Sequence, residues 1–249
     1  MSTEAVTHLP PTPPSEPSTY NNRTAPTSAP QSQQKHLWVI TGPAGCGKTS
    51  VAEYLHQQLQ LPYLEGDTVS HPYKFQWHRQ QLTNLQFHTP ENVQKMANGQ
   101  PLTDADRWDW LILLREQALL TLTKPSSPQP PTTPTTPTAS SASTLPPSGV
   151  IITCSALKRK YRDVLRIAAY HRPDLSVHFV YLQASEAVLM DRVRARQNHY
   201  MKDYMVHSQF QSLEAPQEDE LRGDVLSVDA GGESKEVQRL ALGMVRGVM

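Results

Sequence analysis

The chain has 249 residues, with 23 basic and 23 acidic side chains, so its formal net charge is zero at pH 7. A neutral chain is not expected to bind nucleic acid through a broad basic face, and no apolar run of about eighteen residues, the length that crosses a membrane, occurs in it. Its two cysteines, Cys46 and Cys154, are too few for a disulfide framework and favour a reducing, cytoplasmic compartment.

Residues 1–35 form a tail that is rich in Pro, Ser and Thr and has few charges or large apolar side chains. Such a segment cannot bury enough apolar surface to offset the entropy of ordering it, so we expect it to be disordered. It lacks the apolar region of a secretory signal, and it is not rich in arginine as a mitochondrial presequence is. The tail is therefore predicted to precede the folded domain, residues 36–249.

The most informative segment follows the first predicted strand, residues 36–41, and reads Gly42-Pro43-Ala44-Gly45-Cys46-Gly47-Lys48-Thr49. This is a complete G-x-x-x-x-G-K-[ST] phosphate loop, and its end overlaps a predicted helix at 48–60. Glycines let backbone N–H groups turn toward phosphate oxygens at the helix N-terminus. Lys48 is expected to reach the β- and γ-phosphates and the Thr49 hydroxyl to hold Mg²⁺. A glycine-rich turn without chemical meaning is the alternative.

Short apolar runs alternate with helical stretches along the rest of the chain, which indicates an α/β fold. Further strands are predicted at 62–65, 149–154, 177–182 and 224–229, and further helices at 91–98, 104–123, 157–170, 185–196, 203–211 and 234–246. The strands are almost continuously apolar, as buried parallel strands are, and ligands of such sheets bind beyond the carboxyl ends of the strands. Polar segments at 42–49, 65–67 and 154–158 follow strands, so we expect them to converge on one site.

Residues 124–148 form a second Pro/Thr/Ser stretch, between a predicted helix and a predicted strand. We interpret it as a low-complexity surface loop inserted into the domain. A polyproline segment on which a partner docks is the alternative.

Two candidate site residues stand at the ends of predicted elements. Asp67 ends the second predicted strand and could accept the proton of an attacking hydroxyl or orient a Mg²⁺-bound water; an aspartate that caps a helix or turn is the alternative. Arg107 lies in the first turn of the helix at 104–123, where the helix dipole disfavours a cation. That misfit indicates a substrate anion as its partner, and pairing with Asp104 or Asp106 is the alternative.

Two basic clusters follow. Residues 158–162 contain four cations just past a predicted strand, where contact with an anion and a solvated face are both open. In the segment 191–196, Arg192 and Arg196 share one helix face, whereas Arg194 points elsewhere. Small kinases close a lid whose arginines stabilise charge on the transferring phosphoryl group, and an exposed helix with incidental arginines is the alternative.

Together these blocks resemble the gluconokinase family of P-loop kinases. The resembling segments are residues 42–49, 65–67, 90–96, 99–107, 154–159, 161–163, 208–210 and 213–214, spread over positions 36 to about 245. The resemblance implies a three-layer fold in which a five-stranded parallel sheet has helices on both faces and a helical lid, as in shikimate and adenylate kinases. It also implies a homodimer that phosphorylates the 6-hydroxyl of D-gluconate with ATP and Mg²⁺, yielding 6-phospho-D-gluconate.

Gluconate carries one carboxylate and a row of hydroxyls, so its site needs cations and short polar groups. Under the resemblance, catalysis falls to Lys48, Asp67 and Arg196, and gluconate binding to Asp67, His88, Asn92, Arg107, Lys158, Arg162 and Gln209. ATP binding falls to Gly42, Pro43, Ala44, Gly45, Cys46, Gly47, Lys48, Thr49, Ser50 and Arg192, and Mg²⁺ binding to Thr49. The alternatives are a kinase of shikimate or nucleotide type, or a nucleotide-binding splice product that is catalytically impaired.

The segment Val69–Gln86 interrupts the family pattern, which runs from Glu-Gly-Asp through two residues to His. Deleting it joins Thr68 to Phe87 and restores that spacing before His88. Val69-Ser70 can be encoded by a 5′ splice signal, and Gln86 by a 3′ signal. We therefore hypothesise that residues 69–86 are a retained intron; a genuine surface loop is the rival, since the entropy of loop closure grows slowly with length.

Overall fold

The computed structural model describes residues 34–66, 91, 94–95, 102–123, 146–195 and 203–249. Every described element belongs to the unit formed by Gln33–Met249. The predicted tail up to residue 33, both insertions (69–86 and 124–148, apart from 146–148) and most of the helix expected at 91–98 lie outside the described residues.

Five parallel strands form the central sheet, in the order β2-β3-β1-β4-β5. They are β1 (Lys35–Thr41), β2 (Tyr63–Glu65), β3 (Gly149–Thr153), β4 (Leu175–Gln183) and β5 (Val225–Asp229). β1 lies at the centre, with Trp38 opposite Ile151 of β3 and His178 of β4. Each strand lies within two residues of its predicted position, because a buried parallel strand must be apolar on both faces and the sequence shows such runs.

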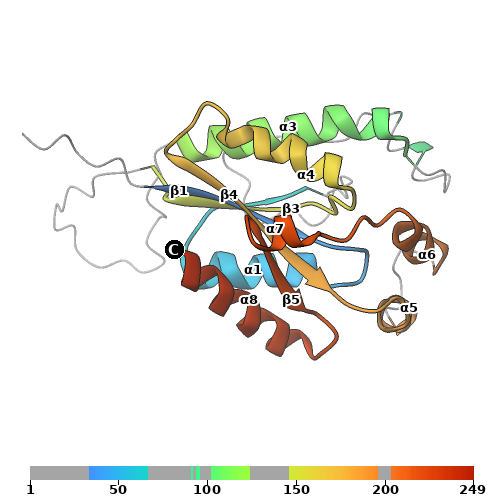
Figure 1. Ribbon diagram of the computed structural model, residues 1–249. Helices are drawn as coiled ribbons and strands as arrows, with labels where there is room; N and C mark the ends of the chain where they lie inside the picture. The colour runs from blue at the N-terminus through green and yellow to red at the C-terminus, as the bar shows by residue number, and fades with distance from the viewer. Residues whose placement is uncertain (1–33, 67–90, 92–93, 96–101, 124–145, 196–202) are drawn as a thin grey trace, which may run out of the picture. The chain divides into compact units, whose positions relative to one another are not determined.

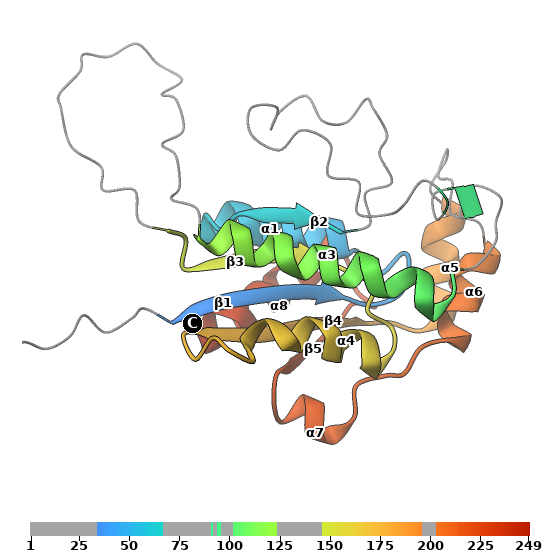
Figure 2. The same cartoon turned by 90° about the horizontal axis from the view of Figure 1, so that it is seen from above.

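Helices cover both faces of the sheet (Figures 1 and 2). They are α1 (Lys48–Leu59), α3 (Asp104–Thr123), α4 (Arg159–Arg166), α5 (Glu186–Ala195), α6 (Asp203–Gln211), α7 (Glu218–Leu221) and α8 (Ser234–Val248), with a short 3₁₀ turn η1 (Ile167–Ala169) after α4. In Figure 1, α3 and α4 lie on one side of the sheet, α1 and α8 on the other, and α5 and α6 beyond its end.

Side chains alternate between two cores along β1. Leu37 and Val39 pack with the α3 and α4 face, and Trp38 and Ile40 pack with α1 and α8. All four are fully buried. Because successive side chains of a strand point to opposite faces, one apolar run supplies both layers, and each such side chain contributes about 1.5–3 kcal/mol by leaving water.

The structure shortens one predicted helix and adds a helix that was not predicted. The helix expected at 157–170 begins at Arg159 and ends at Arg166, and the backbone then tightens into η1. The short helix α7 was not predicted at all, since its single turn is too short for an apolar period and its residues, Glu-Asp-Glu-Leu, are mostly acidic. It is held by a capping box in which Gln217 and Glu220 each accept from the other's backbone.

Two histidines and a tryptophan stack on the α1 and α8 side of the sheet. The ring centroids of Trp38 and His178 are 4.4 Å apart, and His36 Nδ1 lies 3.1 Å from His178 Nε2. This contact needs one ring nitrogen to donate and the other to accept, so it suits neutral imidazoles. Burial first, and then the neighbouring His36, lower the pKa of His178 from 6.5 to about 4, although Asp224 opposes the shift.

We expect this pair to make the protein less stable in mild acid. In the unfolded chain His178 takes up a proton near pH 6.5, whereas in the folded protein its pKa is about 4. The neutral imidazole therefore makes its full contribution to the free energy of unfolding above pH 6.5, and this contribution is lost as the pH falls toward 4. His178→Gln keeps a hydrogen-bonding side chain but cannot take up a proton. Between neutral pH and mild acid, the variant should therefore lose about 1–2 kcal/mol less unfolding free energy than the wild type, a value that is lowered because His178 is partly exposed. Urea unfolding at about pH 7.5 and pH 4.5 measures it. The exposed His171→Gln is the control, and an unchanged pH dependence in His178→Gln would contradict the prediction.

Candidate functional site

The loop between β1 and α1 has the backbone of an anion cradle. Gly42, Gly45 and Gly47 have φ angles of 140°, 84° and 98°, which side chains with a Cβ rarely adopt. A Cβ on Gly42 would lie 2.8 Å from the Leu182 carbonyl oxygen. The chain then enters α1 at Lys48, so the free N–H groups of the first helical turn adjoin the loop.

Lys48 is folded back over this loop. Its ammonium donates to the carbonyl oxygens of Gly42 at 3.1 Å and Pro43 at 3.3 Å, and the residue is only 8% exposed. Thr49 follows on the exposed side of the first turn. The cation and the hydroxyl that the sequence predicted for phosphate and Mg²⁺ therefore stand at the same helix end, and the residues present fit a nucleoside triphosphate with its metal ion.

The sheet topology places this loop at a switch point of the sheet. β1 and β3 are neighbours, but the helix that follows β1 packs on one face and the helix that follows β3 on the other. Ligands of open α/β sheets bind at such a switch point, beyond the carboxyl ends of the strands. The chain leaving β3 is tied there, because Thr41 Oγ1 donates to the Ser155 carbonyl at 2.7 Å.

Three hydrogen-bonding groups hold Gly66, where the chain leaves β2. Gly66 N–H donates toward both the carbonyl and the hydroxyl oxygen of Thr153, each at 3.1 Å. Trp110 Nε1 donates to the Gly66 carbonyl at 2.9 Å. A Cβ on Gly66 would lie 2.0 Å from the Thr153 carbonyl oxygen, so the position admits only glycine. The backbone that leads into Asp67 is thereby held against β3 and α3.

Several basic side chains surround the ring of Tyr161, between α3 and α4. Arg107 Cζ lies 5.8 Å from the centroid of the Tyr161 ring, and Lys158 Nζ 5.7 Å from it. Lys158 also pairs with Asp104 at 3.1 Å, and the Lys160 and Tyr161 side chains donate to the same carboxylate. These three donors, Lys160 foremost, hold the pKa of Asp104 well below its usual range, so the aspartate is a fixed anion within the group.

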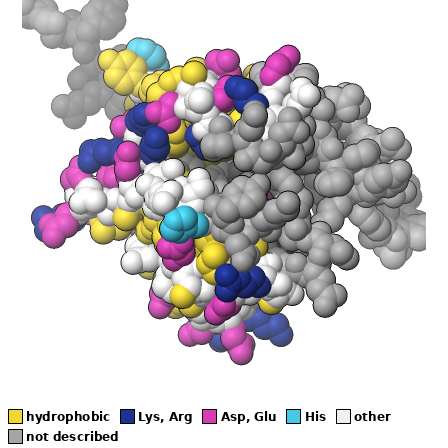
Figure 3. All heavy atoms as spheres, turned by 90° about the vertical axis from the view of Figure 1, so that its right-hand side faces the viewer, with side chains coloured by type: hydrophobic (Ala, Val, Ile, Leu, Met, Phe, Trp, Pro, Cys, Tyr) yellow, Lys and Arg dark blue, Asp and Glu magenta, His cyan; other side chains and the backbone are white. Residues whose placement is uncertain are grey.

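Helix α6 reaches the phosphate loop through Gln209. The amide oxygen of Gln209 accepts from Ala44 N–H at 2.7 Å. In Figure 1, α5 and α6 lie beyond the end of the sheet at which the loop stands, and Figure 3 shows that end of the molecule. Basic and acidic side chains are interspersed on the described part of this face, with no broad basic patch. Within the described residues no helix is long and apolar enough to cross a membrane.

Curated relatives decide the family. No family model matches the chain. A probable gluconokinase of Schizosaccharomyces pombe is 37% identical to it over 206 residues, which are 83% of this chain and 86% of the relative. The chain belongs to the gluconokinase family. The thermoresistant gluconokinase of Escherichia coli (strain K12) is 34% identical over 195 residues, 78% of this chain and 84% of that one.

Solved structures agree with the gluconokinase assignment. A gluconokinase from Sinorhizobium meliloti superimposes with a TM-score of 0.61 at 30% identity and covers 87% of this chain and 94% of its own. A sugar kinase from Janibacter gives a TM-score of 0.59 at 29% identity, covering 86% of this chain and 95% of its own. The predicted P-loop kinase fold, with its five-stranded parallel sheet and helices on both faces, is therefore confirmed.

The structure gathers some of the residues predicted for gluconokinase activity and leaves others undescribed. The structure describes four of the predicted features: the phosphate loop, Arg107, Lys158 and Gln209. Arg107 and Lys158 lie together at the Tyr161 ring, and Gln209 contacts the phosphate loop itself. The alternative was that Arg107 pairs with Asp104 or Asp106, but its guanidinium donates to the Leu102 carbonyl instead. Lys158 donates to Asp104, and Lys95 donates to Asp106. Asp67, His88, Asn92 and Arg196 lie outside the described residues.

Arg192 was predicted to bind nucleotide together with Arg196. Its guanidinium donates to three backbone carbonyls just after β5: Ala230 at 2.7 Å, Gly231 at 3.1 Å and Gly232 at 2.6 Å. Such a fork fixes the course of the loop between β5 and α8. We propose that Arg192 shapes this loop; contact with the nucleotide itself stays a prediction.

The predicted contact between Arg162 and substrate is wrong. The Arg162 side chain is 2% exposed and forms a buried ion pair with Glu220, which is also 2% exposed. Burial by itself would raise the pKa of Glu220, but hydrogen bonds from Arg162 and Arg166 more than reverse this and lower it to about 2. Arg162 lies four residues after Lys158, the residue that caps α4, and its guanidinium is buried against Glu220.

Sequence reasoning missed the groups that hold the site in place. Thr153, Glu214 and Glu220 were given no role, and neither was Trp110. Their partners lie 44 or more positions away along the chain, beyond the reach of any local pattern. The one available signal was the buried strand end at Thr153, a polar residue in an otherwise apolar run.

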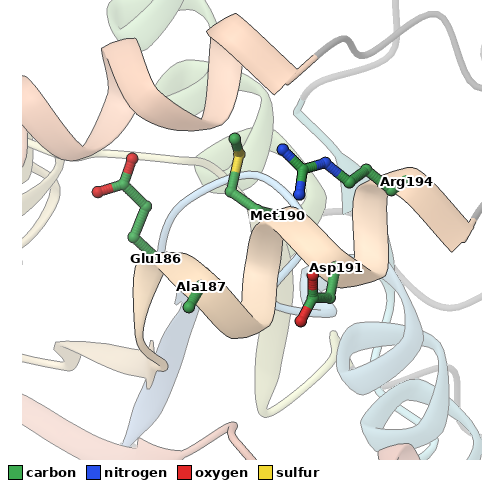
Figure 4. Close-up of a pocket in the computed structure, with 5 residues that line it drawn as sticks. All are labelled: Glu186, Ala187, Met190, Asp191 and Arg194. Atoms are coloured by element: carbon green, nitrogen blue, oxygen red, sulfur yellow. The ribbon is translucent and has the colours of Figure 1, made fainter.

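Two surface hollows lie outside this arrangement. One of about 380 Å³ is lined by Glu186, Ala187, Met190, Asp191 and Arg194 (Figure 4). All five side chains come from α5, so among the described residues no other element contributes groups that would converge on a ligand. The second, of about 360 Å³, lies between α4 and α7, where arginines already pair with the carboxylates that line it. Neither is a better candidate site than the strand ends beside the phosphate loop.

Proposed function

We propose that this chain transfers the terminal phosphoryl group of ATP to the 6-hydroxyl of D-gluconate. The observation that carries the proposal is a complete phosphate loop at the switch point of a gluconokinase-family sheet, with Lys48 buried over it. Bound ATP with Mg²⁺ would supply the phosphoryl group and neutralise charge on it. Gly42–Thr49 would hold the phosphates, and Thr49 the metal ion.

In this proposal the sugar acid lies beyond the carboxyl ends of β1 and β3. Arg107 and Lys158 offer cations for the carboxylate, and Asp104 and Tyr161 keep them in place. Asp67 follows the fixed residue Gly66 and would orient the attacking hydroxyl and take up its proton. A carboxylate is a weak base at neutral pH, so positioning should contribute more than proton abstraction.

ADP release with gluconate, ATP and Mg²⁺ tests this activity, with shikimate and nucleoside monophosphates as competing acceptors. Gluconate-dependent ADP release that exceeds every other acceptor supports the proposal. ATP binding without transfer to any sugar acid would favour the impaired splice product instead. We further propose that the chain forms a homodimer, as the family resemblance implies, and that it works in the cytoplasm, as its two cysteines favour. Sedimentation equilibrium of the purified chain measures the oligomeric state.

Removing residues 69–86 should raise activity if the segment is a retained intron. It follows Asp67 by two residues and separates it from His88, which the family keeps close. We expect the shortened chain to turn over gluconate at least tenfold faster, because misplaced substrate groups commonly cost ten- to a hundredfold. ATP binding should change little, because the phosphate loop precedes the segment. Equal kinetics of the two forms would contradict the prediction, and coding DNA without splice signals at these borders would exclude the intron.

A further inference from the structure

Arg162 and Glu220 form a buried ion pair for which the proposed chemistry has no direct use. Two hydrogen bonds join them, Nε to Oε1 at 2.8 Å and Nη2 to Oε2 at 2.7 Å. Both side chains are 2% exposed. Taking two charges out of water costs about as much as their attraction returns, so apolar side chains of similar volume are often as stable. Stability alone therefore does not account for the pair.

The third nitrogen of Arg162 joins two segments that are distant in the chain. Nη1 faces the carbonyl oxygens of Ala156 at 3.3 Å, Leu157 at 3.5 Å and Glu214 at 3.0 Å. Ala156 and Leu157 belong to the connection between β3 and α4, and Glu214 to the connection between α6 and α7. Figure 2 shows the second connection running past the N-terminal end of α4. A single guanidinium thus holds both connections.

Glu214 strengthens the same junction. Its N–H donates to the Leu157 carbonyl at 2.9 Å, and its carboxylate accepts from Arg159 N–H, in the first turn of α4, at 2.8 Å. Ala156 has a φ of 36°, a conformation that is strained for a residue with a Cβ and persists only where the surroundings enforce it. Arg162 and Glu214 supply that enforcement from two sides.

Each connection leads to residues of the proposed site. The β3–α4 connection ends in Lys158, and its Ser155 is bonded to Thr41, the residue before the phosphate loop. Helix α6 carries Gln209, whose amide contacts Ala44 of that loop. A shift between the two connections would move Lys158 and Gln209 relative to each other.

We propose that Arg162, oriented by Glu220, is a positioning residue for phosphoryl transfer: it locks the β3–α4 and α6–α7 connections together and so aligns Lys158 and Gln209 with the phosphate loop. This inference rests on the proposed function, because its test measures gluconate kinetics.

Three variants separate positioning from stability. Arg162→Met leaves the Glu220 carboxylate buried without its main partner, so the melting temperature should fall by roughly 5–10 °C. The double variant Arg162→Met/Glu220→Gln removes both charges and keeps an amide acceptor for Arg166, so its melting temperature should return to within about 3 °C of the wild type. The control Arg159→Met breaks an ion pair of the same helix that is exposed, with side chains 48% and 59% accessible.

We expect kcat/KM for gluconate to fall about tenfold or more in both Arg162 variants, including the thermally restored double variant, with the larger part of the loss in KM for gluconate. The Kd for ATP should stay within about twofold of the wild type, and Arg159→Met should keep the kinetics of the wild type. All kinetics are measured at about 15 °C, where the less stable variant is still folded.

If the double variant recovers kcat/KM together with its melting temperature, the pair is merely structural and the inference is overturned. If the double variant stays as unstable as Arg162→Met, its kcat/KM at low temperature still decides, since wild-type kinetics there overturn the inference and a tenfold loss supports it. A wild-type chain that leaves gluconate unphosphorylated contradicts the proposed function itself, and this inference with it.

Discussion

Replacing Lys48 by alanine should lower turnover on gluconate at least a hundredfold. Lys48 is 8% exposed, and the Gly42 and Pro43 carbonyls hold its ammonium over the phosphate loop, where it would meet charge that develops on the transferring phosphoryl group. Removing one such preorganised donor costs about a hundred- to a thousandfold in kcat.

The loss should appear in kcat more than in folding. The Lys48 hydrogen bonds to Gly42 and Pro43 lie within its own loop, and losing them should lower the stability by only about 1 kcal/mol. Steady-state ADP release gives kcat, and thermal unfolding gives stability. Lys235→Ala removes an exposed lysine near the start of α8 and serves as the control. Wild-type kcat in Lys48→Ala would show that the loop does not take part in transfer.

The architecture was predictable because its signals are local. An apolar run such as 149–154 must be a buried strand, and the phosphate loop joins a strand to a helix by its own glycines. Strand positions and the phosphate-loop site follow from these two patterns. The family resemblance added the order of the remaining parts, which periodicity alone does not give.

The packing around the site was not predictable, because it depends on pairs that meet only after folding. Arg162 looked like a substrate cation, since charge next to a strand end is all that the sequence shows. Its partner Glu220 is 58 positions away, in a helix too short to be recognised. Likewise, Trp110 gives no sign that its indole bonds a carbonyl 44 positions earlier. Which cations bind substrate and which hold the fold is decided by burial, and burial is a property of the folded chain.

A substitution at Gly66 is the second change from which we expect a large effect on stability and turnover. Replacing it by alanine should destabilise the protein by about 2–4 kcal/mol, because overpacking at a rigid position costs 1–3 kcal/mol and here the obstacle is backbone. The added Cβ would lie 2.0 Å from the Thr153 carbonyl oxygen and 2.9 Å from Leu114 Cδ2. The chain can relieve this clash only by leaving β3, which also breaks the Trp110 bond to the Gly66 carbonyl.

The same displacement moves the next residue, Asp67, so gluconate turnover should fall at least a hundredfold even at temperatures where Gly66→Ala is folded. ATP binding should survive, since the phosphate loop is built on β1 and α1. Gly243→Ala is the matched control: this helical glycine has open space around it, and alanine there should stabilise α8 by about 1 kcal/mol without changing kinetics. Urea unfolding and ADP release at about 15 °C measure both effects. A Gly66→Ala chain that equals the wild type in stability and turnover would mean that the exit of β2 tolerates a side chain and does not fix Asp67.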